Sequence, residues 1–235
     1  MNILVNGGSV SRGPGSWPYV IQQHLNAELV NLSQSGSGNT YIHETTISEL
    51  AQRSYDLVLI QWTPFIRFDF KVHNIEKFSN TIFTSLHQAA QNDWPEKIVE
   101  PINDQDYVEK DWIFGCGVSV NSDKDFALND AFSGFYRHCG PYEQMYHAII
   151  KLISLQSFLK VNNIPYLFVF GRPLRIAKRY NNLQKLIDYN HMYTDNYILD
   201  IAEKNQQWGD DKIHPSAVAY TQFAELILPK IRQLL

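Results

Sequence analysis

The sequence has little charge, little cysteine and no long apolar run. Lysine and arginine number 20 and aspartate and glutamate 24, which gives a formal net charge of −4. A protein that binds nucleic acid usually has a basic surface for phosphates, so we expect no such partner. No window approaches the roughly 18 apolar residues of a membrane-spanning helix, and the N-terminus lacks the basic and apolar regions of a signal peptide. We therefore expect a cytoplasmic protein without a membrane span.

Cysteine and histidine are arranged too sparsely for a metal site. Cys116 and Cys139 lack the spacing of metal ligands, and whether they form a disulfide stays open. His138 precedes Cys139, but no second pair of ligands accompanies them. The glycine-rich segment 6–9 lacks the lysine of a phosphate-binding loop. We expect neither a metal nor another cofactor.

The sequence does contain enough apolar residues for a core, since 44% of its 235 residues are hydrophobic. This length suits one α/β domain over residues 1–235. Short apolar runs predict strands and helical spacing predicts helices, in alternation, which is typical of a parallel sheet with helices on both faces. The strands are expected at 3–5, 28–32, 56–61 and 166–170, with a further candidate at 197–199, and the helices at 17–26, 42–53, 142–161 and 215–235.

Residues 63–141 break this alternation. The segment is rich in aromatic residues, asparagine and aspartate, and it contains Trp94-Pro95. We interpret it as an insertion or lid that belongs to the same domain.

A serine and an Asp–His pair stand at the two ends of the pattern. Ser9 follows the first strand, at a turn that lifts its side chain into the crevice where open α/β sheets bind ligands. A serine nucleophile needs a base, usually a histidine that a carboxylate orients. Asp211 and His214 supply both groups, three residues apart and before Pro215. The structural alternatives are an ordinary Gly-Gly-Ser turn and a helix cap made by Asp211.

Three segments resemble, in order, the first, second and fifth sequence blocks of the SGNH (GDSL-type) hydrolases. They are Gly7 to Ser11, Asn31 to Gly36, and Asp211 to His214, which Pro215 follows. The resemblance implies a three-layer α/β/α sandwich with a mainly parallel, five-stranded, flavodoxin-like sheet. It also implies a serine esterase without a cofactor, which hydrolyses a carboxylic ester through an acyl-enzyme.

The resemblance assigns roles to single residues. Ser9 is the nucleophile, His214 the general base and acid, and Asp211 the residue that orients the imidazole. The backbone N–H groups of Ser9 and Gly36 bind the oxyanion that develops on the substrate. The expected partner is a small-molecule or carbohydrate ester, such as an O-acetyl or acyl group on a sugar. An O-acyltransferase would use the same residues, and the oligomeric state stays open.

The third block departs from the family pattern. The family has Gly-x-Asn-Asp after the third strand, and its Asn side chain completes the oxyanion hole. Here Gln61-Trp62-Thr63 stands at this place, and Thr63 and Asn39 are alternative donors. Loss of one such donor costs about 10²–10³ in rate. A non-catalytic glycan-binding protein on the same scaffold is therefore the alternative from another class.

Trp62 and Arg67 are the candidate substrate-binding residues. Trp62 is able to stack on a sugar ring, and its structural alternative is core filling under the insertion. Arg67 is suited to a carboxylate or phosphate of the substrate, and its structural alternative is pairing with Asp69 or another acid.

Overall fold

The computed structural model describes residues 1–65, 68–71, 112–115 and 127–235. Four strands of this part form a parallel sheet in the order β2-β1-β3-β6. The two central strands are buried on both faces, which explains why they are continuous apolar runs in the sequence. The strands are β1 (Asn2–Asn6), β2 (Glu28–Asn31), β3 (Leu57–Trp62) and β6 (Tyr166–Phe170).

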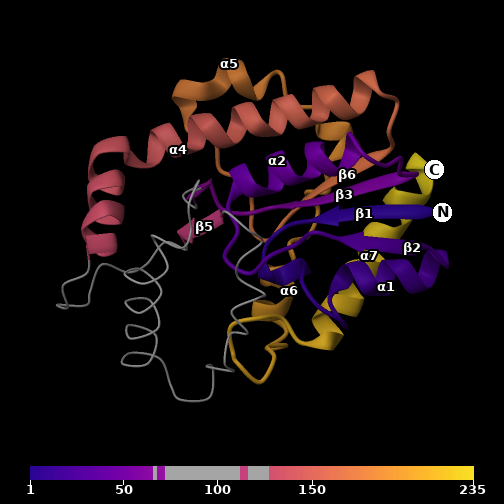
Figure 1. The fold of residues 1–235 in the computed structure, drawn as a ribbon. Helices are drawn as coiled ribbons and strands as arrows, with labels where there is room; N and C mark the ends of the chain where they lie inside the picture. Colours follow the sequence, from indigo (N-terminus) through magenta and orange to yellow (C-terminus); the bar gives the residue numbers. More distant parts are fainter. Residues whose placement is uncertain (66–67, 72–111, 116–126) are drawn as a thin grey trace.

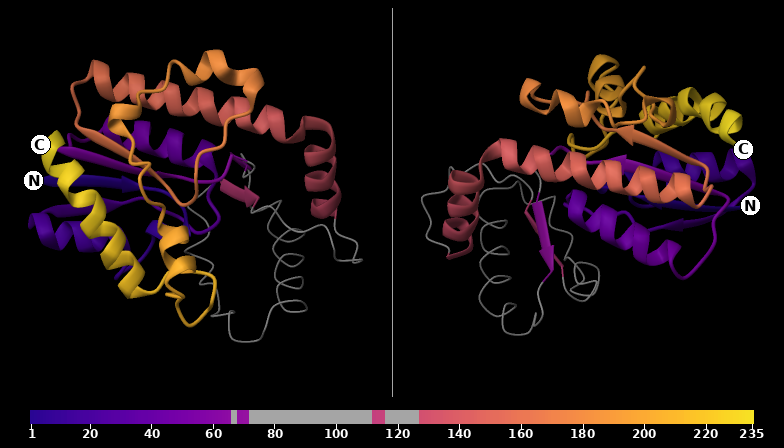
Figure 2. Two further views of the ribbon diagram at one scale, coloured as in Figure 1. Left: turned by 180° about the vertical axis from the view of Figure 1, so that it is seen from behind. Right: turned by 90° about the horizontal axis from the view of Figure 1, so that it is seen from above.

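Helices cover both faces of this sheet (Figures 1 and 2). One face packs against α1 (Trp17–Leu25), α6 (Ile198–Lys204) and α7 (Ala217–Leu234). The other packs against α2 (Asn39–Leu50) and α4 (Ala127–Val161). Successive strand side chains point to opposite layers, because strands alternate with a period of two. The expected three-layer α/β/α sandwich with a parallel sheet is confirmed.

The prediction of a fifth strand in this sheet is wrong for the described part of the chain. Next to β6, only an isolated parallel bridge joins Phe168 to Met192, and the N–H of Tyr193 donates to Phe168 O at 2.9 Å. Met192 and Tyr193 point into opposite core layers, as in a strand, but the pairing goes no further. The sequence predicted a further strand at residues 197–199, but α6 begins at Ile198 instead. A short apolar run does not separate a strand from a buried helix.

Part of the predicted insertion is regular structure. Strands β4 (Phe68–Lys71) and β5 (Trp112–Gly115) pair antiparallel, with Phe68 opposite Gly115. Helix α4 begins at Ala127, well before the start that the sequence predicted at residue 142. The remaining short elements are η1 (Ser9–Ser11), η2 (Lys178–Tyr180), α5 (Asn181–Gln184) and η3 (Tyr189–His191). No helix among the described residues has the length and apolar character to cross a membrane.

Candidate active site

The chain turns sharply after β1, and Ser9 is the first residue of the short turn η1. Asn6 fixes the end of β1 by accepting from the N–H of Gly7 at 2.8 Å and donating to α2, for example to Thr46 Oγ1 at 3.0 Å. A Cβ at Gly7 would lie 2.9 Å from the Cβ of Gln61, so the loop approaches β3 at a distance that only glycine allows. Ser9 is partly exposed, and its hydroxyl and N–H form no hydrogen bond within the described residues.

Asp211 and His214 lie in a tight turn before α7. Two backbone bonds close this turn, from Gly209 N–H to His214 O at 2.8 Å and from Lys212 N–H to Gly209 O at 2.9 Å. Asp211 Oδ1 accepts from the N–H groups of Ile213 and His214, each at 2.9 Å, and Asp211 Oδ2 lies 2.5 Å from His214 Nδ1. The carboxylate therefore holds both the turn and the imidazole ring.

Asp211 does not cap α7. The N-cap of this helix is Ser216, whose hydroxyl accepts from the N–H of Ala219 at 3.4 Å. The helix-cap alternative for the Asp-x-x-His segment is therefore not what the structure shows. The contacts of Asp211 go to its own turn and to His214.

The contacts of Asp211 set its charge and the tautomer of His214. Partial burial opposes the charge of Asp211, but the hydrogen bonds from the His214 ring and from the N–H groups of His214 and Ile213 outweigh it and lower the pKa of the carboxyl. An ionised carboxylate only accepts, so the proton of the neutral imidazole lies on Nδ1 and the lone pair on Nε2. Both side chains are about a third exposed, 34% for Asp211 and 37% for His214. This is the arrangement that a general base requires.

Helix α1, which follows the turn of Ser9, packs on the same face of the sheet as α7, which follows the turn of His214 (Figure 1). The rings of Trp17, at the start of α1, and Phe223, in α7, meet edge-on with centroids 5.8 Å apart. Trp17 Nε1 also donates to Ser11 Oγ, in the turn of Ser9, at 2.9 Å. In the described structure no hydrogen bond joins Ser9 to His214.

The loop that contains Gly36 lies against the loop of Ser9. Gly7 O accepts from Ser37 Oγ at 2.9 Å and from the N–H of Gln34 at 3.1 Å, so the residues on both sides of Gly36 hold the two loops together. Gly36 has a φ of 82°, in the left-handed region that favours glycine. The assignment of its N–H to the oxyanion stays a prediction.

Asn39 and Thr63, the two alternatives for a further oxyanion donor, contact each other. Asn39 Oδ1 accepts from Thr63 N at 3.0 Å and from Thr63 Oγ1 at 3.1 Å, and Asn39 Nδ2 donates to Thr63 O at 3.1 Å. An amide oxygen only accepts, so the hydroxyl proton of Thr63 points to Asn39. Asn39 has a second amide proton with no acceptor within the described residues.

The two candidate substrate-binding residues differ in what the structure shows of them. Trp62 is 1% exposed, and its ring meets that of Phe168 edge-on with centroids 5.5 Å apart, which is the core-filling alternative. Arg67 lies outside the described residues.

Asp69, suggested as a partner of Arg67, is 6% exposed and holds the N-terminus of α2. Its carboxylate accepts from the N–H groups of Gly38 at 2.8 Å, Tyr41 at 2.9 Å and Thr40 at 3.1 Å. Burial raises the pKa of Asp69, although these bonds act in the opposite direction. No local sequence pattern connects β4 to the start of α2, so this role of Asp69 could not be predicted from the sequence.

The strand order of the sheet is 2-1-3-6, Ser9 follows β1, and the Asp211–His214 pair precedes the last helix. Among solved structures, TesA is similar with a TM-score of 0.53 and 15% identity over the whole of both chains. The psychrotrophic esterase EstA from a Pseudoalteromonas species is similar with a TM-score of 0.50 and 14% identity, over 99% of this chain and 97% of EstA. No protein-family model and no curated protein matches the sequence. The likenesses show the fold.

Proposed function

We propose that this protein is a serine hydrolase that cleaves carboxylic esters. The observation that carries the proposal is the Asp211–His214 pair, in which a carboxylate contacts the imidazole ring in the turn before α7. The fold supports this proposal, since EstA, which has a similar fold, is an esterase whose solved structure contains the enzyme inhibited by monoethylphosphonate.

The proposed reaction proceeds in two steps through an acyl-enzyme. Ser9 Oγ attacks the ester carbonyl carbon, and His214 Nε2 takes the serine proton and passes it to the leaving alcohol. Water then attacks the acyl carbon, His214 takes a proton from the water and returns it to Ser9 Oγ, and the carboxylic acid leaves. Asp211 keeps the imidazole in the tautomer with Nδ1–H and stabilises its positive charge. The hydrogen bond between Ser9 and His214 forms when substrate binds, since such bonds are often long without substrate.

The oxyanion would be bound by donors from three segments. The N–H of Ser9 and the second amide proton of Asn39 have no acceptor among the described residues. The family resemblance adds the N–H of Gly36. In this proposal Thr63 orients the Asn39 amide and does not itself contact the oxyanion.

A fluorophosphonate probe tests the nucleophile. We expect the wild type to be labelled at Ser9 and Ser9→Ala to be unlabelled, with Ser48→Ala as a matched control because Ser48 is an exposed serine of α2. Mass spectrometry identifies the labelled residue. Labelling that persists in Ser9→Ala would contradict the assignment.

A panel of esters then defines the reaction. Acetyl and longer-chain esters, including acetylated sugars, are offered to the wild type and to Ser9→Ala. Release of acid by the wild type alone supports the esterase, while transfer of the acyl group to a sugar hydroxyl indicates the O-acyltransferase.

The replacement of the family's Asn-bearing loop by Gln61-Trp62-Thr63 favours the glycan-binding alternative. Absence of both labelling and turnover would favour that alternative over catalysis.

A further inference from the structure

Gln61 is a buried polar residue at the end of the apolar strand β3, and it is 3% exposed. Its Oε1 accepts from the N–H of Gly8 and from Ser11 Oγ, each at 3.1 Å. Its Nε2 donates to Trp62 O at 3.1 Å. The side chain therefore holds the residue before Ser9 and the second residue after it.

Elementary chemistry decides which atom is the donor in each hydrogen bond around Gln61. The N–H of Gly8 only donates and Trp62 O only accepts, so the Gln61 amide has one orientation. The indole N–H of Trp17 only donates, and it donates to Ser11 Oγ at 2.9 Å. Ser11 consequently gives its own proton to Gln61 Oε1. Each of the five groups has at least one hydrogen-bond partner, and a connected buried polar network of this kind makes a structure rigid.

This network leaves the nucleophile itself unengaged. Gly7, Gly8 and Ser11 are held against β3, while the Ser9 side chain makes no hydrogen bond among the described residues. The loop is fixed on a strand buried on both faces, and the serine hydroxyl remains available for reaction. Displacement of a reacting group by about 1 Å costs roughly 10² in rate.

We propose that Gln61 is a positioning residue, which fixes the loop of Ser9 through Gly8 and Ser11. The expected effect of Gln61 on kcat rests on the proposed function. The expected effect of Gln61 on the rigidity of the Ser9 loop rests on the contacts alone.

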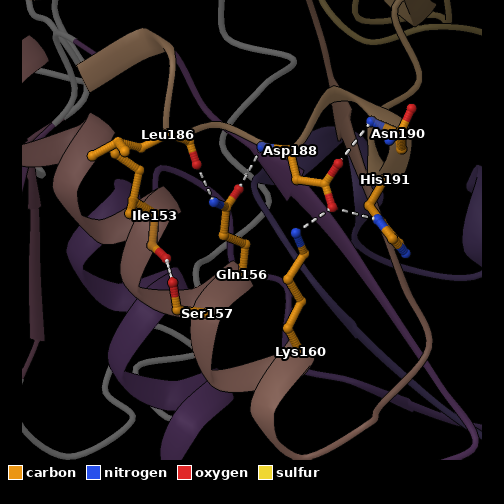
Figure 3. A network of polar contacts seen from close by, with 8 residues as sticks. All are labelled: Ile153, Gln156, Ser157, Lys160, Leu186, Asp188, Asn190 and His191. Atoms are coloured by element: carbon orange, nitrogen blue, oxygen red, sulfur yellow. Dashed lines mark hydrogen bonds and ion pairs between the residues drawn. The ribbon is translucent and has the colours of Figure 1, made fainter. Parts of the chain in front are cut away.

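Gln61→Met tests the inference, because methionine has a similar length but no hydrogen-bonding amide. The chain offers a matched control in Gln156→Met (Figure 3). Gln156 is also buried, at 4% exposed, and also binds two backbone groups: Nε2 donates to Leu186 O at 2.5 Å, and Oε1 accepts from Asp188 N at 3.0 Å. These contacts lie between α4 and the segment after α5.

We expect Gln61→Met to lower kcat by roughly 10- to 100-fold with a much smaller change in KM. Gln156→Met should lower thermal stability but leave kcat close to that of the wild type. Ser11→Ala acts on the same network, so the double variant Gln61→Met/Ser11→Ala should lose no more kcat than the worse single variant. A wild-type kcat in Gln61→Met, an equal loss in Gln156→Met, or losses that multiply in the double variant would overturn the inference.

Hydrogen exchange separates this inference from the proposed function, because it needs no activity. Exchange in the segment 7–12 should be faster in Gln61→Met than in wild type, and unchanged in Gln156→Met. If wild type is neither labelled nor active but exchange behaves in this way, the proposed function fails and the positioning role stands. Unchanged exchange of the segment in Gln61→Met would refute the positioning role.

Discussion

Asn39 and Thr63 bind each other in both directions, since Asn39 accepts from the N–H of Thr63 and donates to its carbonyl oxygen. The pair joins the first turn of α2 to the end of β3, the place where the resemblance noted in the sequence predicts an Asn-bearing loop. The amide of Asn39, which is 3% exposed, is thereby held in one orientation. A donor from α2 would in this way replace the donor that the third block lacks.

The first prediction distinguishes these two residues as oxyanion donors. Thr63→Val removes only the hydroxyl and keeps both backbone bonds to Asn39, so its kcat should stay close to the wild-type value. Asn39→Ala removes the amide and should lower kcat by about 10²–10³. Steady-state kinetics on an ester that the wild type hydrolyses measures both. A larger loss in Thr63→Val than in Asn39→Ala would assign the role to Thr63.

The second prediction concerns the carboxylate behind His214. In Asp211→Asn the amide no longer stabilises the positive imidazole or selects its tautomer, so kcat should fall by roughly 10⁴. Asp210→Asn is the control, because Asp210 is exposed, lies next to Asp211 and forms no hydrogen bond or ion pair with His214 among the described residues. Activity of Asp211→Asn equal to that of Asp210→Asn would show that the pair has no catalytic role.

Local patterns predicted much of the fold, and they pointed to the residues of the candidate site. The strands are short apolar runs, Ser9 lies in the turn after β1, and Asp211 and His214 lie in the turn before α7. The features that these patterns could not predict depend on contacts between segments that are distant in the sequence. Gln61 was visible as a polar residue in an apolar strand, but its partners Gly8 and Ser11 are about fifty residues away in the sequence.

The third prediction concerns one of these distant contacts, the binding of the α2 N-terminus by Asp69. Asp69 Oδ2 accepts from both Gly38 and Tyr41, and an amide in its place has only one accepting oxygen. Asp69→Asn should therefore leave a buried N–H unsatisfied and lower the free energy of unfolding by about 1–3 kcal/mol. Urea unfolding measures it. Asp56→Asn is the control, since its exposed carboxylate accepts one N–H, from Asn2, and we expect little change there.

The last prediction concerns Asp188, which lies in the segment after α5 (Figure 3). Asp188 Oδ2 lies 2.6 Å from Lys160 Nζ and 2.8 Å from His191 Nδ1, and Oδ1 accepts from Asn190 N at 3.0 Å. Partial burial opposes the charge, but these contacts outweigh it and lower the pKa of Asp188. The cluster ties the segment after α5 to α4.

The sign of the pH dependence follows from this lowered pKa. A carboxyl with a lower pKa in the folded state stabilises the fold above its unfolded pKa of about 3.9, and this stabilisation is lost as the pH falls through the folded pKa. Asp188→Asn should lower the free energy of unfolding by about 1.5–3 kcal/mol at pH 7, and the difference from wild type should shrink below about pH 4. Urea unfolding between pH 7 and pH 3 measures both, with the exposed Asp195→Asn as control. Because only the ionised carboxylate pairs with Lys160, a difference that stays constant over this range would show that the charge of Asp188 does not hold the segment.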